Sequence, residues 1–233
     1  MKPIKKTDSD KPWNRRKKAE SRKRETVQPS RIIYIFSEGT KTEVIYFKSF
    51  PVLSAQVTAV GLGLSRTELI KESIKRKNSI LQNSPKSEKK KYSFWCVYDQ
   101  DIELTSLQVS NEERQKDFDD AFTLGRENEL NLAYSNDSFE LWFLLHYQYH
   151  DTVWTRKEYY RKLSDLWNIN YEKEGKKEEF CLSIYNKLSE KQNNAITNAR
   201  KLFEEQSDLN PSLQNPCTLV YRLVELLNKH IRK

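Results

Sequence analysis

Five successive apolar residues at positions 32–36, IIYIF, place the strongest constraint on the fold. They are β-branched or aromatic and no polar residue alternates with them, which is the pattern of a strand buried on both faces. A second run, YSFWCVYDQD at residues 92–101, has the same apolar character and also ends in acidic residues. Because strands covered on both faces occur in parallel sheets between layers of helices, the sequence predicts an α/β fold.

Strand and helix patterns alternate four times before residue 152. The predicted strands are 32–36, 55–63, 92–101 and 130–137, and the predicted helices are 43–50, 65–80, 112–128 and 138–150. This alternation predicts a mostly parallel, four-stranded sheet that is flanked by helices.

The pattern becomes entirely helical from about residue 152. Helices are predicted at 156–168, 178–191, 193–206 and 217–231, and together they form a C-terminal helical annex. We therefore expect three parts: a basic tail (1–30), an α/β core (31–151), and the annex (152–233) as part of the same domain as the core. The length of 233 residues is enough to bury a core.

The formal charge of +8 is concentrated at the N-terminus. Residues 1–31 hold 12 Lys and Arg against 4 Asp and Glu, which leaves 29 of the 41 basic and 29 of the 33 acidic residues for a neutral remainder. Such a tail is expected to be disordered alone and could hold phosphates by salt-sensitive attraction; the alternative is a solvated tail without a specific partner. Its candidate nucleic-acid-binding residues are Arg15, Arg16, Lys17, Lys18, Arg22, Lys23 and Arg24.

Cysteine content and hydropathy favour a cytoplasmic protein without a membrane partner. The cysteines are odd in number, far apart and without a CxxC motif, which argues against a disulfide framework or a zinc ribbon. The longest apolar stretch, around residues 141–145, is too short to cross a bilayer, and the N-terminus lacks the apolar core of a secretory signal.

The first predicted strand ends at an acidic residue and a glycine turn, SEGT at residues 37–40. Gly39 permits a tight turn or a close backbone approach. Thr40 and Glu43 have the spacing of a capping box, which predicts that a helix begins there. Since sites in open α/β sheets are built where strands lead into helices, Glu38 is a candidate site residue.

Asp99 and Asp101 follow the third predicted strand. If the chain stays extended, residues two apart point to one face, so both carboxylates can converge. Their mutual repulsion is relieved by a cation between them, and hard oxygen ligands favour Mg²⁺ or Mn²⁺. A DxD alone is common in solvated turns. However, in a parallel sheet Glu38 would end a strand at the same edge, so three acids would meet there.

Several ordered motifs resemble the RloB-like proteins, a family related to the Toprim domain of topoisomerases, bacterial primases and overcoming-lysogenization-defect nucleases. These motifs are SEGTKTE after the first strand, VYDQD after the third, YSNDSFELWFLLHY, and NPCTLVYRLVELL at 215–227. The resemblance covers about residues 31–231. One departure is Asp137, which follows Asn136 where the family usually carries proline.

The resemblance implies a Toprim-like sheet with a metal-dependent site. Glu38 would be a general acid/base or a metal ligand, and Asp99 and Asp101 would bind Mg²⁺. Proteins of this family look like components of bacterial anti-phage or abortive-infection systems, often beside an ATPase of the ABC/SMC type. Asp137 would add a further acid near the metal.

Further candidates have ordinary alternatives. Glu43 could be a metal ligand, although the capping box accounts for it. Glu140 lies in an otherwise apolar segment, where a carboxylate needs a partner or a purpose. Lys41 could hold a phosphate or be solvated. His146 and His150 have the spacing of zinc ligands on a helix, but no third ligand is evident, so partial packing of the helix explains them as well.

The sequence contains no GxxxxGK[ST] motif, so any ATP hydrolysis must come from a partner. We expect a Mg²⁺-dependent nuclease that acts on nucleic acid as an effector of phage defence. The main alternative is a non-catalytic Toprim-like sensor or regulatory subunit of an ATPase-containing complex, and a third is another phosphoryl-transfer enzyme. The choice of DNA or RNA and the presence of a homo-oligomer are left open.

Overall fold

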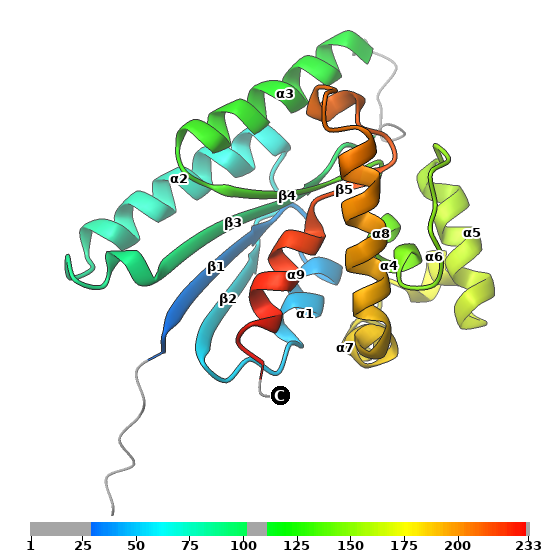
Figure 1. The fold of residues 1–233 in the computed structure, drawn as a ribbon, viewed down its shortest axis with the longest axis horizontal. Helices are drawn as coiled ribbons and strands as arrows, with labels where there is room; N and C mark the ends of the chain where they lie inside the picture. The colour runs from blue at the N-terminus through cyan, green and yellow to red at the C-terminus, as the bar shows by residue number, and fades with distance from the viewer. Residues whose placement is uncertain (1–28, 102–110, 232–233) are drawn as a thin grey trace, which may run out of the picture.

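The computed structural model describes residues 29–101 and 111–231. Its centre is a five-stranded sheet in the order β2-β1-β3-β4-β5 (Figure 1). The strands are β1 (Arg31–Ser37), β2 (Ala55–Gly61), β3 (Tyr92–Asp99), β4 (Asn131–Asn136) and β5 (Cys217–Thr218). The first four are parallel to one another and β5 is antiparallel to β4. The predicted mostly parallel α/β fold is therefore confirmed, whereas the predicted number of four strands is wrong.

The fifth strand comes from a segment that the sequence predicted as a helix, 217–231. Cys217 and Thr218 instead pair with Asn136 and Ser135, and the helix α9 covers only Val220–Asn228. A strand of two residues is too short to show a period of its own. The helical spacing of the apolar residues that follow it therefore dominates the pattern.

The strands β1 and β3 lie side by side, as predicted for residues 32–36 and 93–99. Their register runs from the pair Ile32–Tyr92 to the pair Ser37–Val97. Beyond it, the Glu38 N–H donates to the Val97 carbonyl at 2.9 Å. Because the two strands are parallel and in this register, their carboxyl ends lie at the same edge of the sheet.

Helices cover both faces of the sheet (Figure 1). One face packs against α2 (Arg66–Gln82) and α3 (Asn111–Glu127), and the other against α1 (Thr42–Lys48), α4 (Glu140–Leu145) and α9. The neighbouring residues Ile35 and Phe36 point to opposite faces, yet both are buried. This burial on both sides is what the unbroken apolar run predicts.

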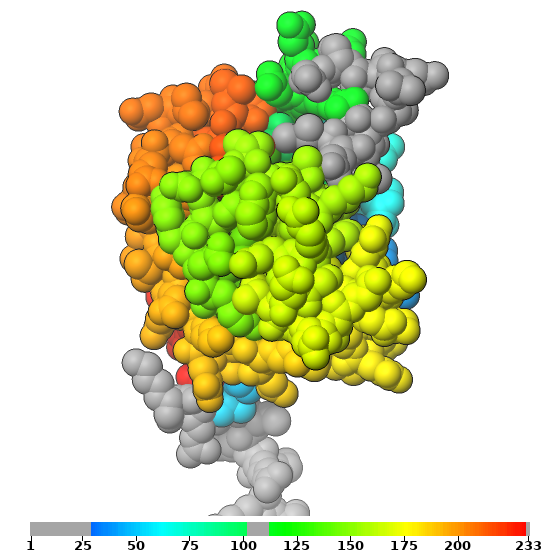
Figure 2. Space-filling model, turned by 90° about the vertical axis from the view of Figure 1, so that its right-hand side faces the viewer, coloured from blue at the N-terminus to red at the C-terminus, as the bar shows by residue number. Residues whose placement is uncertain are grey.

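The annex extends the layer that contains α1 and α4. Its helices are α5 (Arg156–Trp167), α6 (Tyr171–Glu174), α7 (Glu178–Leu188) and α8 (Gln192–Glu205), with short 3₁₀ turns at Ser189–Lys191 and Pro211–Leu213. A further 3₁₀ turn at Lys89–Lys91 precedes β3, outside the annex. In this layer α7 packs on α1, and α8 packs on α4 and α9. Figure 2 views the molecule from this side, where the annex helices form the surface.

Buried aromatic side chains join the annex to the sheet. The ring of Tyr46 on α1 packs edge-on against Phe139 and Phe143, and its hydroxyl accepts a hydrogen bond from Trp142 Nε1 at 2.9 Å. Tyr185 of α7 belongs to the same cluster, with its ring centroid 4.6 Å from that of Phe50 and 6.5 Å from that of Tyr46. The segment after β4 is thus held by aromatic contacts, and only six of its residues, rather than the predicted 138–150, are α-helical.

In the described part of the chain, no helix combines the length and the apolar character that a membrane span requires. The three cysteines, Cys96, Cys181 and Cys217, are free and buried. The basic residues 15–24 and the other residues of the predicted tail up to 28 lie outside the described residues.

Candidate functional site

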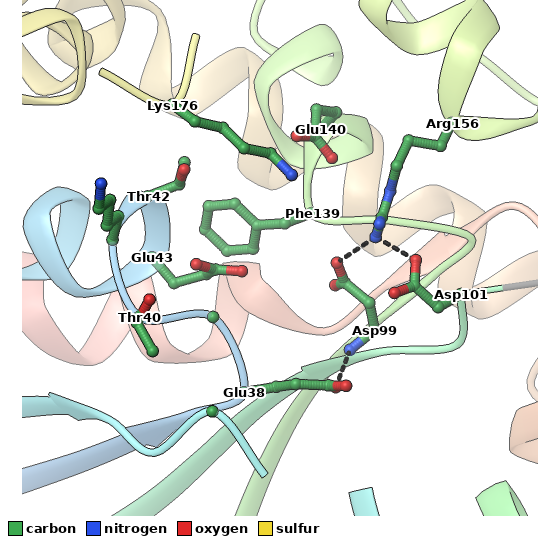
Figure 3. A pocket seen from close by; sticks show the side chains of 13 residues that line it. Glu38, Thr40, Thr42, Glu43, Asp99, Asp101, Phe139, Glu140, Arg156 and Lys176 are labelled. Carbon is green, nitrogen blue, oxygen red and sulfur yellow. Dashed lines mark hydrogen bonds and ion pairs between the residues drawn. The ribbon is translucent and has the colours of Figure 1, made fainter. Parts of the chain in front are cut away.

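A cavity of about 340 Å³ opens where β1 and β3 end (Figure 3). Its lining contains five carboxyl groups and three cationic side chains. The lining residues are Glu38, Gly39, Thr40, Lys41, Thr42, Glu43, Gly63, Asp99, Asp101, Phe139, Glu140, Arg156 and Lys176. The structure therefore brings together the three main candidate acids, Glu38, Asp99 and Asp101. The further candidates Lys41, Glu43 and Glu140 line the same cavity.

Glu38 is placed by the turn that follows β1. The Ser37 hydroxyl donates to the Gly39 carbonyl at 2.7 Å and so closes this turn. The Glu38 carboxylate points toward β3 and accepts from the Asp99 N–H at 3.4 Å. Burial, and then the negative charge of Asp101, raise the pKa of Glu38 above its ordinary value of 4.5. A carboxyl group with a raised pKa is suited to proton transfer.

The predicted capping box at Thr40 and Glu43 is wrong. Helix α1 begins at Thr42 with Lys41 as its N-cap, and no side chain caps it. The Glu43 carboxyl group instead folds over the turn, where a β-carbon on Gly39 would lie only 2.0 Å from Glu43 Oε2. Burial first, and then Glu140 and Glu38, raise the pKa of Glu43 to about 7. Glu43 therefore lines the cavity in place of capping the helix.

The two aspartates do converge, but not by strand alternation. Strand β3 ends at Asp99, and Asp101 has a φ of 54°, in the left-handed region that aspartate tolerates. The Asp101 N–H donates to the Asp137 carbonyl at 3.1 Å. The expectation of an extended DxD is thus wrong, because a turn rather than the pleat directs Asp101 to the same cavity.

Arg156, which the sequence analysis missed, lies between the two aspartates. Its Nη2 atom is 3.3 Å from Asp99 Oδ2 and forms a second ion pair with Asp101 Oδ1 (Figure 3). Arg156 is the first residue of α5, whose start is fixed by Glu158 accepting from the Thr155 N–H and hydroxyl. Thr155 and Glu158 have the spacing of a capping box and could have located this start, but nothing local indicates where Arg156 points.

Burial raises the pKa of Asp99 well above its ordinary value of 3.8, and Glu43 and Asp101 add to the rise. The pKa of Asp101 is also raised, mainly by burial, although Arg156 opposes the shift. Burial, together with repulsion among the carboxyl groups, therefore disfavours their charged forms, and Arg156 offsets this only in part.

Glu140 has the partner that its apolar surroundings require. Its side chain is 5% exposed, and Oε1 accepts from the Tyr171 hydroxyl of α6 at 3.2 Å. Lys176, in the turn after α6, enters the cavity from the annex toward Glu140 and Glu43 (Figure 3). Neither Tyr171 nor Lys176 carries a local sequence signal. Lys41 is an exposed residue on the cavity lining.

Asp137 does not belong to the cavity lining. It is buried, the peptide that links it to Asn136 is cis, and its carbonyl receives the Asp101 N–H. Its described role is therefore to position the turn at Asp101 through the backbone. The suggestion of an additional acid beside a metal has no support from the cavity lining.

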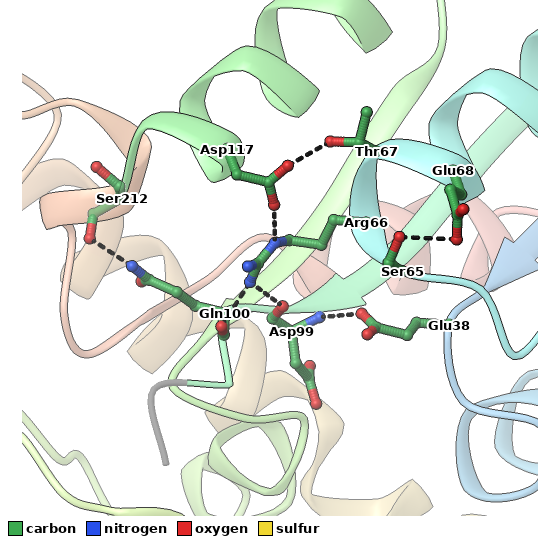
Figure 4. Close-up of polar contacts among 9 residues, drawn as sticks. All are labelled: Glu38, Ser65, Arg66, Thr67, Glu68, Asp99, Gln100, Asp117 and Ser212. Atoms are coloured by element: carbon green, nitrogen blue, oxygen red, sulfur yellow. Dashed lines mark hydrogen bonds and ion pairs between the residues drawn. The ribbon is translucent and has the colours of Figure 1, made fainter. Parts of the chain in front are cut away.

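A polar network on the other side of β3 holds the strand end (Figure 4). Arg66, at the start of α2, donates through Nη1 to the Asp99 carbonyl at 3.2 Å and to the Gln100 carbonyl at 2.5 Å. Its Nε pairs with Asp117 of α3 at 3.2 Å, and Asp117 also accepts from the Thr67 hydroxyl at 2.6 Å. Arg66 thus fixes the backbone that carries Asp99.

The two histidines form no metal site with each other. His146 caps the end of α4 and shares a 2.8 Å hydrogen bond between Nδ1 and the Trp142 carbonyl, while His150 lies beyond the helix. Within 29–101 and 111–231, no three His, Cys, Asp or Glu side chains form a ready-made metal centre. Between Asp99 and Asp101 the nearby cation is Arg156.

The fold and the site define an α/β protein with an acidic cavity at the carboxyl edge of a mostly parallel sheet. The sequence model of the family described as RloB-like protein matches residues 33–227. The chain belongs to this family, so the resemblance noted in the sequence is confirmed. Searches of curated proteins and of solved structures found no significant match to the chain.

Proposed function

We propose that this protein is a Toprim-type, Mg²⁺- or Mn²⁺-dependent nuclease that acts as an effector of a bacterial anti-phage or abortive-infection system. The observation that carries the proposal is the position of Glu38, Asp99 and Asp101 around one cavity, at the edge where two neighbouring parallel strands end. This is the edge at which open α/β sheets place their sites.

The donor chemistry of the cavity fits a hard divalent cation. The lining holds five carboxyl groups and only three cationic side chains, and the pKa values of Glu38, Glu43, Asp99 and Asp101 are all raised. When bound, Mg²⁺ would polarise a phosphate oxygen and make water more acidic. Asp99 and Asp101 would hold it, with Glu38 as a third ligand or proton carrier, and Arg156 would have to leave at least one aspartate.

The side chains of the chain itself supply the remaining chemistry. Glu38, with its raised pKa, would take a proton from water or give one to the leaving oxygen. Arg156 and Lys176 enter the cavity from the annex and would bind non-bridging phosphate oxygens. Each has hydrogen-bond donors and a positive charge, which match the charge that develops during phosphodiester hydrolysis.

The expected partners come from the family resemblance and from the charge of the chain. RloB-like proteins resemble components that act beside an ABC/SMC-type ATPase, and such a partner would supply any ATP hydrolysis, since the sequence contains no P-loop. The basic residues before position 31 would add affinity for nucleic acid, either DNA or RNA. Free, buried cysteines are compatible with a reducing cytoplasm.

One observation favours a second candidate function, a non-catalytic sensor or regulatory subunit of an ATPase-containing complex. The guanidinium of Arg156 bridges Asp99 and Asp101, where a catalytic metal would otherwise be held. In a regulatory subunit this bridge would be the functional state. It would fasten the annex to the sheet, and no metal would be needed.

The test is incubation of the purified full chain, alone and with a candidate ABC/SMC-type ATPase partner, on mixed DNA and RNA with Mg²⁺ or Mn²⁺. We expect metal-dependent cleavage that Glu38→Gln abolishes and Glu204→Gln, an exposed site on α8, leaves unchanged. Full phage protection by both Glu38→Gln and Asp99→Asn, without cleavage by any form, would replace the nuclease by the regulatory subunit.

A further inference from the structure

Strand β4 is paired along one side but only at one end along the other. Its residues Asn131 to Ser135 pair with β3, whereas β5 pairs only with Ser135 and Asn136. The last hydrogen bond on the β5 side is that of the Leu219 N–H, which donates to the Tyr134 carbonyl at 2.9 Å. After it the chain enters α9 and leaves the edge, so β5 lies beside only one end of β4 (Figure 1).

The part of this edge beyond β5 has backbone hydrogen-bonding groups at Leu132, a residue that is 6% exposed at the edge of the sheet. In a strand, successive residues direct their N–H and C=O groups to opposite sides. The Tyr134 carbonyl faces the β5 side, so the N–H and C=O of Leu132 face the same side. No described strand pairs with Leu132 there. An unpaired edge of this kind can accept an extended peptide as an additional strand.

A hollow of about 530 Å³ adjoins this free edge. Apolar and aromatic side chains from β3, α3 and α8 form much of its wall, and Leu209 on its rim is 46% exposed. Its aromatic members are Trp95, Phe122, Tyr134 and Phe203. Side chains of a docked strand point alternately to the two faces of the sheet, so one set of them would enter such a hollow.

Two exposed arginines define the charge of the hollow. Arg222 on α9 lies over the Phe203 ring at 4.6 Å, and Arg126 on α3 lies over the Phe122 ring at 5.8 Å. Neither forms an ion pair with a carboxylate among the described residues. The rings hold both guanidinium groups at the hollow, and carboxylates of a ligand would complete them.

These charges discriminate between possible occupants. The residues before position 31 carry an excess of basic residues, so the two arginines would repel them. A second copy that paired through the same edge would bring two more arginines to the interface. An acidic ligand meets no such repulsion, and only a peptide backbone matches the strand edge as well.

We propose that the free edge of β4 and the adjoining hollow bind an extended, acidic segment of a partner protein by strand addition. The segment would pair with the Leu132 peptide, place apolar side chains in the hollow, and present Asp or Glu to Arg126 and Arg222. This interaction does not depend on the chemistry of the acidic cavity, so it stands whether or not the protein is a nuclease.

The test uses a display library of random short peptides selected on the full chain, followed by fluorescence anisotropy with the enriched peptide. We expect enriched sequences with alternating apolar residues and at least one carboxylate. Arg126→Gln and Arg222→Gln should each weaken binding about tenfold. The matched control is Arg161→Gln, an exposed arginine on α5 away from the hollow, and it should bind as the wild type does.

A second measurement examines the backbone. N-methylation of alternate peptide amides should abolish binding in one register only, and bound peptide should slow hydrogen exchange at the Leu132 amide. Absence of an enriched acidic peptide, or binding that ignores both arginine variants and N-methylation, would overturn the proposal. So would a dimer of the chain alone that already protects the Leu132 amide, since the edge would then be an interface between copies.

Discussion

The two sides of the acidic cavity differ in origin and in charge. The sheet side supplies three carboxylates: Asp99 from the last residue of β3, and Glu38 and Asp101 from the turns that follow β1 and β3. The annex side supplies the cations Arg156 and Lys176. The sheet thus creates a site with excess negative charge and the annex partly neutralises it. The ion or ligand bound in the cavity should therefore depend on how firmly the annex holds its cations there.

The largest effect should come from removing an acid of the sheet side. Glu38→Gln or Asp99→Asn should lower nuclease activity at least about a hundredfold, because both proton transfer and metal binding would be impaired. Neither should unfold the protein, since loss of a crowded carboxylate relieves repulsion. Cleavage assays with circular dichroism on the same samples would check this. Cleavage at the wild-type rate by either variant would mean that the sheet acids are not the reactive groups.

The packing around His146, at the end of α4, should be sensitive to acid. His146 is fully buried, and burial lowers its pKa from 6.5 to about 4. Between these values the unfolded chain binds a proton that the folded chain does not. The contribution of His146 to the free energy of unfolding should therefore be fully present above pH 6.5. It should fall by at most about 3 kcal/mol as the pH drops toward 4.

The variant His146→Asn tests whether His146 causes this loss of stability at low pH. Asparagine retains a donor for the Trp142 carbonyl but does not titrate. Denaturation midpoints at pH 7 and pH 5 should differ less in the variant than in the wild type. An unchanged difference between the two pH values would assign the acid sensitivity to other groups.

Removing Arg156 of the annex should have a smaller effect on stability, and the response of the variant to Mg²⁺ should show whether Arg156 competes with a metal. Arg156→Gln leaves Asp99 and Asp101 without their ion pair and should cost about 2 kcal/mol in the absence of metal, since all three side chains are partly exposed. Mg²⁺ should then raise the melting temperature of the variant more than that of the wild type, because no guanidinium competes for the aspartates. A smaller Mg²⁺ response than in the wild type would show that Arg156 supports the metal instead of competing with it.

The smallest effect on the cavity should come from deleting residues 1–28. We expect the melting temperature to be unchanged and the affinity for nucleic acid to fall, with a flatter salt dependence. Each phosphate that the shortened protein no longer neutralises should reduce the slope of log affinity against log salt by about 0.9 on duplex DNA. Filter binding over a salt series measures this slope, and an unaltered slope would make the tail a solvated segment.

The sequence predicted the sheet side of the cavity better than the annex side. Unbroken apolar runs indicate buried parallel strands, and parallel strands place their carboxyl ends together, so Glu38 and Asp99 could be expected near one another. Arg156 and Lys176 reach the cavity only through tertiary packing of α5 and of the turn after α6. No period or motif records the direction in which such side chains point.

Each error in the sequence-based prediction has its own identifiable cause. The spacing of Thr40 and Glu43 fits a capping box, but burial of the Glu43 carboxyl group over Gly39 prevails over the cap. Asp101 reaches the cavity through a left-handed turn that an extended reading of DxD omits. Strand β5 is too short to have a pattern. Asp101 and β5 are placed by contacts with segments distant in sequence, Asp137 and β4, whereas Glu43 is placed over a turn only four residues before it.

The sequence distances within the cavity have a consequence for its assembly on the ribosome. Glu38 and Asp99 are 61 residues apart, and Arg156 lies a further 57 residues beyond Asp99. During synthesis the acids therefore emerge well before the guanidinium that partly neutralises them. Contacts so remote in sequence slow folding. A nascent chain that has just completed β3 thus carries exposed acids without a finished cavity, and the binding chemistry matures only after the annex has been made.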